Sequence, residues 1–155
     1  MKYAIGCDEA ALEMKNVLKE YLINQGVEVL DFGVQEGETA LYPDIAQKVA
    51  VAVQHGQAQR AVLCCGTGLG MAICANKVKG VRATVCHDLL SAERSRKSNN
   101  AQIFCVGARV IAPQEAVLLL DVWHHCEFAG GGSSSKVDRI SEYEEQAFQP
   151  INWGE

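Results

Sequence analysis

The sequence has no surplus of positive charge and no regular pattern of cysteines. Its 14 lysine and arginine residues are outnumbered by 19 aspartate and glutamate residues, which gives a net charge of −5. That balance argues against nucleic acid or an anionic membrane as the main partner, but leaves room for a local basic pocket that binds one phosphate. The seven cysteines form no disulfide framework, and no signal-peptide pattern precedes the first expected strand. We therefore expect a cytoplasmic protein with reduced thiols.

The glycine-rich segment that follows Cys65 lacks the residues that define three common loops. A P-loop ends in Gly-Lys-Ser/Thr, and this segment has no lysine. A cysteine-phosphatase loop needs an arginine six residues after the cysteine, where this chain has Met71. A thioredoxin-like site needs two cysteines separated by two residues, whereas Cys64 and Cys65 are adjacent and should point to opposite faces of a strand.

What the segment does contain is a cysteine at the end of an apolar run, followed by closely spaced glycines. Residues 60–65 are predicted to form a buried parallel strand, and residues 69–78 have the apolar spacing of a helix. The glycines between them allow the chain to turn with positive φ. A thiolate at such a junction is stabilised by the amino end of the helix. Buried cysteines are usually inert small hydrophobic residues, so the motif alone leaves a catalytic role for Cys65 open.

Strands and helices are predicted to alternate over most of the chain. The expected strands are 3–7, 27–32, 60–65, 81–86 and 103–106, and the expected helices are 11–24, 44–54, 69–78, 91–98 and 113–123, with Asp44 capping the second. This alternation implies right-handed βαβ crossovers and a parallel sheet covered on both faces. Ligands of such sheets bind at the carboxyl ends of the strands, so Asp8, Cys65, His87 and residues 107–109 should share one edge.

The last part of the chain has a different character. Residues 129–135 are small and polar without apolar periodicity, which predicts a flexible linker, and residues 137–148 predict an exposed acidic helix. One interpretation is a solvated linker and a surface helix. The other is an arm that crosses to a partner subunit and delivers Lys136 to its active site. We therefore divide the chain into a domain at 1–128 and an arm at 129–155.

Short motifs spread over nearly the whole chain point to one family. They are Gly6-Cys7-Asp8, Tyr42-Pro43, Cys65 through Gly70, Ala75 through Val78, Gly80 through Ala83, Asn99, and Gly107 through Val110. Together they resemble the type B ribose-5-phosphate isomerases, the galactose-6-phosphate isomerase subunits and the tetrulose-phosphate isomerases. The resemblance implies a three-layer α/β/α Rossmann-like sandwich with a five-stranded parallel sheet, no cofactor or metal, and interconversion of an aldose phosphate and a ketose phosphate. It also implies a homodimer, in some members paired into tetramers, with active sites at the dimer interface.

The resemblance further implies roles for individual residues. Cys65 matches the base that moves a proton between C1 and C2 through a cis-enediolate, and the loop N–H groups with the Thr67 hydroxyl would stabilise the negative oxygen. Asp8 and Tyr42 match substrate-contacting positions, although a packed aromatic explains Tyr42 equally well. Arg109 matches a position that faces the phosphate. The other substrate-binding candidates are Glu9, Gly66, Gly68, Gly70, Met71, His87, Ser98 and Asn99, and Lys136 is the second phosphate-binding candidate.

Four positions depart from the ribose-phosphate pattern of the family. Glu9 replaces the histidine of an Asp-His pair, and Ser98 replaces a histidine thought to open the sugar ring. Gly132 and Lys136 replace two arginines that hold the phosphate across the interface. Ribose 5-phosphate has a free O4 and closes into a furanose, whereas the esterified O4 of erythrose 4-phosphate cannot close that ring. We therefore expect a tetrose or tetrulose 4-phosphate as the substrate, followed by ribose 5-phosphate and ribulose 5-phosphate.

The four departures also fit two alternatives. In one, the substrate is a pentose, His87 opens the ring and Arg94 replaces a phosphate contact, but a lone histidine after a strand is more often structural. In the second, the protein is a non-catalytic subunit or a sugar-phosphate sensor, which would not need the thiolate of Cys65. Residues 124–126, His-His-Cys, superficially look like a metal cluster. Because adjacent side chains point apart, a helix end is the better interpretation and no metal site is expected.

Overall fold

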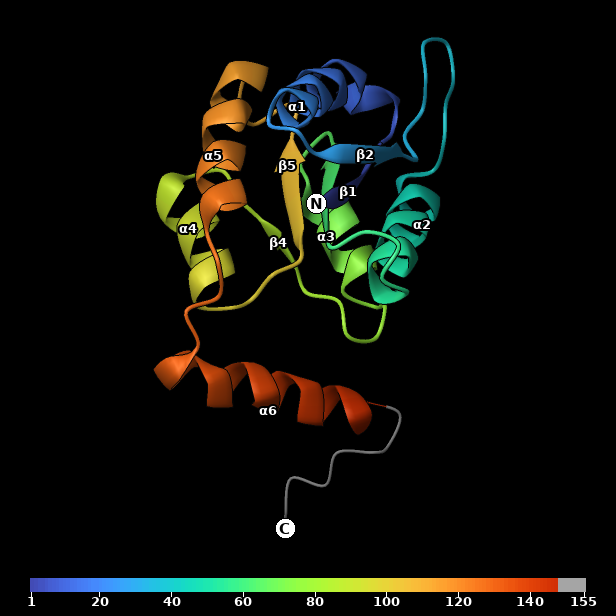
Figure 1. Cartoon of the computed structure of the whole chain (residues 1–155). Helices are drawn as coiled ribbons and strands as arrows, with labels where there is room; N and C mark the ends of the chain where they lie inside the picture. Colours follow the sequence, from blue (N-terminus) through green and yellow to red (C-terminus); the bar gives the residue numbers. More distant parts are fainter. Residues whose placement is uncertain (148–155) are drawn as a thin grey trace.

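The computed structural model of the chain describes residues 1–147 and contains one parallel five-stranded sheet with helices on both faces (Figure 1). Its strands are β1 (Lys2–Cys7), β2 (Glu28–Asp31), β3 (Arg60–Cys65), β4 (Ala83–Val85) and β5 (Ile103–Gly107). Its helices are α1 (Leu12–Asn24), α2 (Tyr42–Gln54), α3 (Leu69–Ala75), α4 (Leu89–Lys97), α5 (Pro113–His125) and α6 (Ser134–Glu145). Short 3-10 turns, η1 (Glu9–Ala11) and η2 (Gly131–Ser133), precede α1 and α6. The predicted α/β sandwich is confirmed.

Two apolar cores hold the layers together. One packs α1, α4 and α5 against one face of the sheet, and the other packs α2 and α3 against the opposite face. Strand β3 contributes to both cores, because successive side chains of a strand point to opposite faces. Cys64 accordingly lies in the first core and Cys65 in the second. The predicted opposite orientation of these two cysteines is confirmed.

Several helix boundaries differ from the predicted ones. Helix α2 begins at Tyr42 with Pro43 in its first turn, so Asp44 lies inside that turn and is not the cap. Proline is favoured there because its missing N–H is one that the first turn leaves unpaired anyway. Helix α4 begins at Leu89, earlier than predicted, because the Asp88 carboxylate accepts the N–H of Ser91 at 2.7 Å and caps it.

Helix α3 ends at Ala75, three residues before the predicted end. The Asn76 side chain turns back and pairs with the backbone of Ala83, donating through Nδ2 to its carbonyl and accepting its N–H, both at 2.8 Å. The amide thereby imitates one step of a strand ladder at the start of β4. Strand β4 accordingly begins at Ala83, two residues after its predicted start.

The segment predicted to be a flexible linker is partly helical. Residues 131–133 form η2, and α6 already begins at Ser134. Helix α6 lies below the sandwich, on the side of the amino ends of the strands (Figure 1). Its carboxyl end is attached to the turn before β4, where the Glu144 carboxylate accepts the N–H of Gly80 at 2.9 Å and Lys79 pairs with Glu145 at 2.8 Å. The predicted end of this helix, Phe148, lies outside the described residues.

In the part of the chain from residue 1 to 147, no helix combines the length and the apolar character needed to cross a bilayer. All seven cysteines lie in this part and are free thiols.

Candidate active site

A cavity opens where the order of the strands reverses. The sheet order is β2-β1-β3-β5-β4, so the crossovers diverge between β1 and β3, whose carboxyl ends border the site expected for a ligand. The cavity has a volume of about 280 Å³, which suits a small molecule. It is lined by Asp8, Ala10, Tyr42, Cys65, Gly66, Thr67, Gly70 and Arg109. Among these, the sequence failed to indicate Ala10, because a methyl group carries no chemical signal.

The sulfur of Cys65 lies at the centre of a tight turn. The backbone N–H of Gly68 donates to Sγ at 3.1 Å, and the cysteine side chain is buried apart from 5% of its surface. Gly68 has a φ of 77°, and a Cβ atom at this position would lie 3.0 Å from the Val106 carbonyl carbon. Only glycine fits both the left-handed conformation and the close approach. The sulfur thus accepts a backbone hydrogen bond at the wall of the cavity.

Tyr42 lies directly against the loop. A Cβ atom on Gly70 would come within 2.5 Å of the Tyr42 ring, so the absence of a side chain at Gly70 is what lets the ring approach. The tyrosine keeps 41% of its surface exposed at the mouth of the cavity. It is therefore both a packed aromatic and a lining residue, and its phenol is free to meet a ligand.

A cation and a carboxylate complete the lining. The Arg109 guanidinium passes over Gly66, where a Cβ atom would lie 3.3 Å from Cζ. Asp8 caps η1 by accepting the N–H of Ala10 at 3.1 Å, and burial raises the pKa of its carboxyl group. A small molecule in the cavity thus meets one fixed positive charge and one carboxyl group that takes up a proton more readily than usual.

Thr67 and Met71 belong to the same turn but contribute differently. The exposed Thr67 hydroxyl accepts the N–H of Leu69 at 3.3 Å and so supports the start of α3. Met71 is fully buried in the core and does not line the cavity, although the sequence proposed it as a binding residue. First-turn N–H groups have no carbonyl partner within their own helix, which leaves that of Gly70, a lining residue, as a donor.

His87 and Glu9 do not line the cavity. His87 follows β4 and its Nε2 accepts the N–H of Gly107 at 2.9 Å, so this nitrogen carries no proton in that arrangement. Burial also lowers the pKa of His87, in keeping with a neutral ring. Glu9 is exposed and accepts the N–H of Ala40 at 3.3 Å, tying the loop after β2 to η1.

The remaining candidates lie at the opposite edge of the sheet. Ser98 and Asn99 directly follow α4, where the Ser98 N–H donates to the Arg94 carbonyl at 2.9 Å, and the chain then leads into the amino end of β5. Lys136 is exposed on α6, which lies on that same side (Figure 1). Parallel strands place their carboxyl ends together, so these three residues are separated by the length of a strand from Cys65 of their own chain.

Within residues 1–147 there is no group of three or more His, Cys, Asp or Glu side chains placed to hold a metal ion. His124 Nδ1 lies 2.9 Å from the Tyr3 hydroxyl, and His125 Nδ1 lies 2.9 Å from the Asp121 carbonyl. Both histidines end α5, as the helix-end interpretation of residues 124–126 predicts.

The fold and the cavity together define a class of protein. A Rossmann-like sandwich carries a thiol beside backbone N–H donors at the switch point of its sheet, with a carboxyl group, a phenol and a guanidinium around the same small space. Groups of these kinds can exchange a proton with a small molecule and stabilise negative charge on it.

The chain belongs to the Ribose/Galactose Isomerase family, whose model matches residues 3–140. It is 49% identical over 147 residues to D-erythrulose-4-phosphate isomerase of Pectobacterium atrosepticum, covering 94% of this chain and 97% of the relative. It is 51% identical over 146 residues to ribose-5-P isomerase B of Listeria innocua, covering 94% of this chain and 99% of the relative. Ribose-5-phosphate isomerase B of Clostridium thermocellum has a solved structure with a TM-score of 0.92 and 41% identity, covering 95% of this chain and 99% of that one. The family predicted from the motifs is confirmed.

Proposed function

We propose that this protein is an aldose–ketose isomerase that interconverts D-erythrulose 4-phosphate and D-erythrose 4-phosphate. The observation that carries the proposal is the Cys65 sulfur, which accepts the Gly68 N–H at 3.1 Å inside a cavity that Arg109 and Asp8 also line. Relatives named for a tetrulose phosphate and for a pentose phosphate are almost equally similar to the chain, at 49% and 51% identity. The length of the sugar therefore has to be argued from the residues.

The proposed reaction needs no oxidant or reductant. The Cys65 thiolate takes a proton from C1 of the ketose, which breaks a C–H bond, forms an S–H bond and gives a cis-enediolate. The sulfur then returns the proton to C2, while the hydroxyl hydrogen passes from O1 to O2 and leaves an aldehyde at C1. The loop N–H groups and the Thr67 hydroxyl stabilise the negative oxygen. The raised pKa of Asp8 suits it to exchange the hydroxyl proton.

The phosphate is assigned to Arg109 from the same chain and to Lys136 from a partner chain. Arg109 lies over Gly66 at the cavity, whereas Lys136 is held on the far side of its own sandwich. A second copy, arranged so that its amino edge meets this carboxyl edge, would bring Lys136, Ser98 and Asn99 to the cavity. We therefore propose a homodimer with its sites at the interface.

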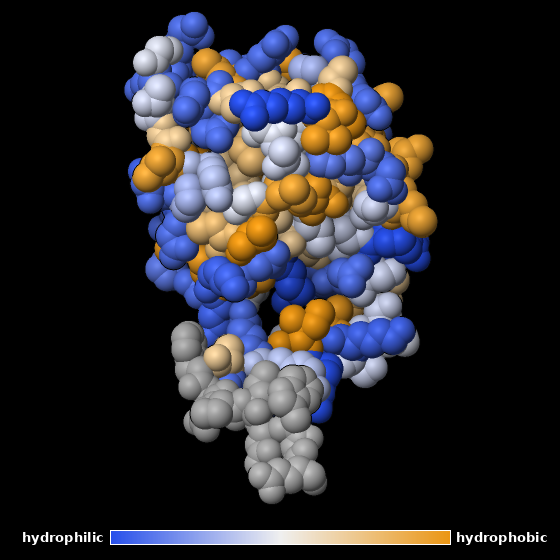
Figure 2. Space-filling view, turned by 180° about the vertical axis from the view of Figure 1, so that it is seen from behind, coloured by the Kyte–Doolittle hydropathy of each residue, from blue (hydrophilic) through white to orange (hydrophobic). Residues whose placement is uncertain are grey.

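Exposed apolar side chains support this assembly. Leu41, Leu69, Ile73, Leu90 and Val110 follow or border the carboxyl ends of the strands and keep between 51% and 74% of their surface exposed. On α6, Ile140 and Tyr143 are 50% and 55% exposed. Apolar surface is also visible both on the sandwich and beside α6 in Figure 2. In the proposed dimer, where an amino edge meets a carboxyl edge, apolar side chains at both edges would be buried against the other chain.

The choice of a four-carbon substrate rests on position 98. A serine cannot protonate a ring oxygen at neutral pH as an imidazole can, and His87, the alternative, already uses Nε2 to accept the Gly107 N–H. Erythrose 4-phosphate does not form the furanose ring and needs no such group. The free cysteines fit a reducing compartment, and we accordingly place the enzyme in the cytoplasm.

The proposal is tested by initial rates with erythrulose 4-phosphate and ribose 5-phosphate measured side by side. We expect a clear preference for the tetrulose phosphate. Equal or better turnover of the pentose would refute the ring-opening argument, and binding without turnover of either compound would indicate a sensor on the same fold.

A further inference from the structure

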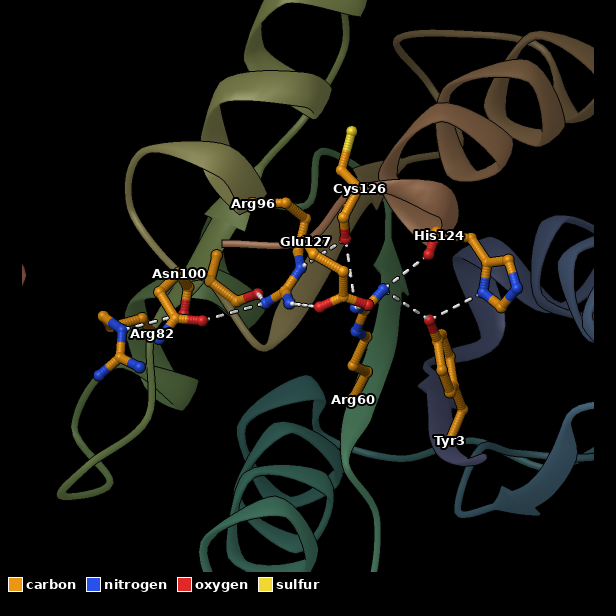
Figure 3. A network of polar contacts seen from close by, with 9 residues as sticks. Tyr3, Arg60, Arg82, Arg96, Asn100, His124, Cys126 and Glu127 are labelled. Carbon is orange, nitrogen blue, oxygen red and sulfur yellow. Dashed lines mark hydrogen bonds and ion pairs between the residues drawn. The ribbon is translucent and has the colours of Figure 1, made fainter. Parts of the chain in front are cut away.

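A cluster of charged side chains with two buried arginines lies at the amino end of β3 (Figure 3). We call it the arginine cluster, and it consists of Arg60, Arg96, Trp123 and Glu127. The two guanidinium groups lie over the Trp123 ring at 5.4 and 5.5 Å from its centroid. Their side chains are only 5% and 6% exposed, and the more exposed Glu127 carboxylate pairs with both. Cation–π contacts and a shared carboxylate make this a fixed arrangement.

The first segment that the cluster holds is the turn between α4 and β5. Arg96 Nη1 donates to the Ala101 carbonyl at 2.5 Å and to Asn100 Oδ1 at 3.4 Å. Asn100 has a φ of 48°, a left-handed conformation that no other non-glycine residue among residues 1–147 adopts. Ser98 and Asn99 come directly before it, and the Asn99 side chain donates to the Arg94 carbonyl at 3.1 Å, so Arg96 holds the end of the turn that carries both residues.

The second segment is the chain that leads from α5 to α6. Arg60 Nη1 donates to the His124 carbonyl at 2.7 Å, and its Nη2 donates to the Cys126 carbonyl at 3.2 Å. Arg96 Nε donates to the same Cys126 carbonyl at 3.4 Å. Two residues beyond Glu127, the Ala129 N–H donates to the Lys97 carbonyl at 3.1 Å and joins the two segments directly. The arm is therefore anchored almost up to the first turn before α6.

We propose that Arg96 and Glu127 are positioning residues, which hold the α4–β5 turn and the α6 arm in one fixed relation so that both enter a partner's active site together. The inference rests on the proposed function, because it takes Ser98, Asn99 and Lys136 to act in the site of a second copy. The guanidinium of Arg96 is suited to the task, since its rigid fork contacts the turn, the arm and Glu127 at the same time. A lysine side chain carries the same charge but lacks the planar fork of N–H donors, so it cannot make these contacts at the same time.

The test compares Glu127→Gln and Arg96→Lys with the wild type in steady-state kinetics on erythrulose 4-phosphate. The glutamine side chain can accept from one guanidinium but must present N–H donors to the other, which loosens the arm while the carbonyl contacts keep the fold. We expect the KM to rise about tenfold with kcat changed less than about twofold, because the partner's groups bind substrate and do not move the proton. In a Lys136→Ala background, Glu127→Gln should raise the KM further by less than about twofold, since both changes remove the same contact with the substrate.

The matched control is Glu28→Gln, which neutralises a similarly exposed carboxylate that pairs with Lys2 at 2.8 Å, on a different part of the surface. It should leave KM unchanged. Hydrogen exchange gives a readout that needs no substrate: amides of residues 129–140 should exchange about tenfold faster in Glu127→Gln, with those of β1 and β3 unchanged.

An unchanged KM, unchanged exchange in the arm, or full additivity with Lys136→Ala would each overturn the inference. Failure of the proposed function has a different signature, since the wild type would then prefer ribose 5-phosphate or turn over neither sugar phosphate. If it prefers ribose 5-phosphate, the same variants are compared on that substrate; if it turns over neither, kinetics gives no readout. In that case hydrogen exchange alone decides whether the arginine cluster holds the arm.

Discussion

The N–H of Gly68 and the sulfur of Cys65 face one another at 3.1 Å across a turn that only glycine can make. The contact places a hydrogen-bond donor on the sulfur before any substrate arrives. Strand β3, the turn at Gly68 and helix α3 thus together position the Cys65 sulfur.

Replacing the sulfur separates an enzyme from a binding protein. We expect Cys65→Ala to reduce kcat by about 10²-fold to 10⁴-fold, the usual contribution of a positioned base, while the affinity for erythrulose 4-phosphate changes less than about threefold. Initial rates and calorimetric titration measure the two quantities. A variant that kept a tenth of the wild-type rate would exclude Cys65 as the base.

Mixing two inactive or weakened chains tests the shared site. If Lys136 serves the partner, a dimer of one Cys65→Ala chain and one Lys136→Ala chain contains one complete site. Random reassociation makes half of the dimers mixed, so about a quarter of the wild-type rate should return with the wild-type KM. A mixture no better than the sum of its parts would show that Lys136 does not act across the interface.

Position 98 should control the choice between tetrose and pentose. We expect Ser98→His to raise kcat/KM for ribose 5-phosphate at least about tenfold, because an imidazole can protonate the ring oxygen, and to change kcat/KM for erythrulose 4-phosphate less than about twofold. Ser98→Asn is the control, since its amide is polar but does not titrate. Failure of the histidine to improve pentose turnover would point to another cause of specificity.

The contact between Gly70 and Tyr42 predicts that Gly70→Ala lowers the free energy of unfolding when Tyr42 is present and raises it when Tyr42 is absent. An alanine methyl at Gly70 would lie 2.5 Å from the Tyr42 ring, so Gly70→Ala should destabilise the wild type and displace the ring from the cavity. In a Tyr42→Ala background the space is empty, and the better helix propensity of alanine should stabilise the protein by up to about 1 kcal/mol. Urea unfolding of the four proteins measures the effect. Destabilisation in both backgrounds would contradict the packing.

Acid should weaken the fold through His87. Burial lowers its pKa below the unfolded value of about 6.5, so between these two values the unfolded chain binds more protons than the folded one. The stability contributed by the neutral ring is complete above about pH 6.5 and is lost as the pH falls through the folded value. His87→Gln retains an acceptor but does not titrate, so its Tm should fall less than that of the wild type between about pH 7.5 and about pH 5. His55→Asn, a change at an exposed histidine, is the control, and parallel curves for His87→Gln and the wild type would contradict the assignment.

The architecture could be predicted because its strands carry strong local signals. Strands β1, β3 and β5 are continuous apolar runs, and a parallel sheet then brings Asp8, Cys65 and Arg109 to one edge without further information. The helix boundaries differ from the predicted ones where a single side-chain contact had a stronger effect than the apolar periodicity. Asn76 ended α3 early by pairing with the backbone of Ala83, and such a contact is invisible until the chain is folded.

The candidate site could be predicted only in part. Ala10 gave no signal in the sequence. Ser98 and Lys136 lie at the amino edge of the sheet, whereas the cavity of their own chain lies at the carboxyl edge. The arginine cluster was equally hidden, because Arg60 contacts residues more than sixty positions later in the sequence and resembles an ordinary strand boundary. Long-range contacts between charged groups have no periodicity that a sequence could display.

Helix α6 and Cys65 lie at opposite ends of the same sheet, and this separation affects how the gene could evolve after duplication. In the assembly proposed, each chain gives an arm and receives one, so a copy of the gene that lost its thiol would still be useful to its neighbour, and so would a copy that lost its arm. After duplication, the two copies would be free to diverge until neither worked alone. In such an enzyme the thiol and the arm of each site already come from different chains, as they would if two genes encoded them.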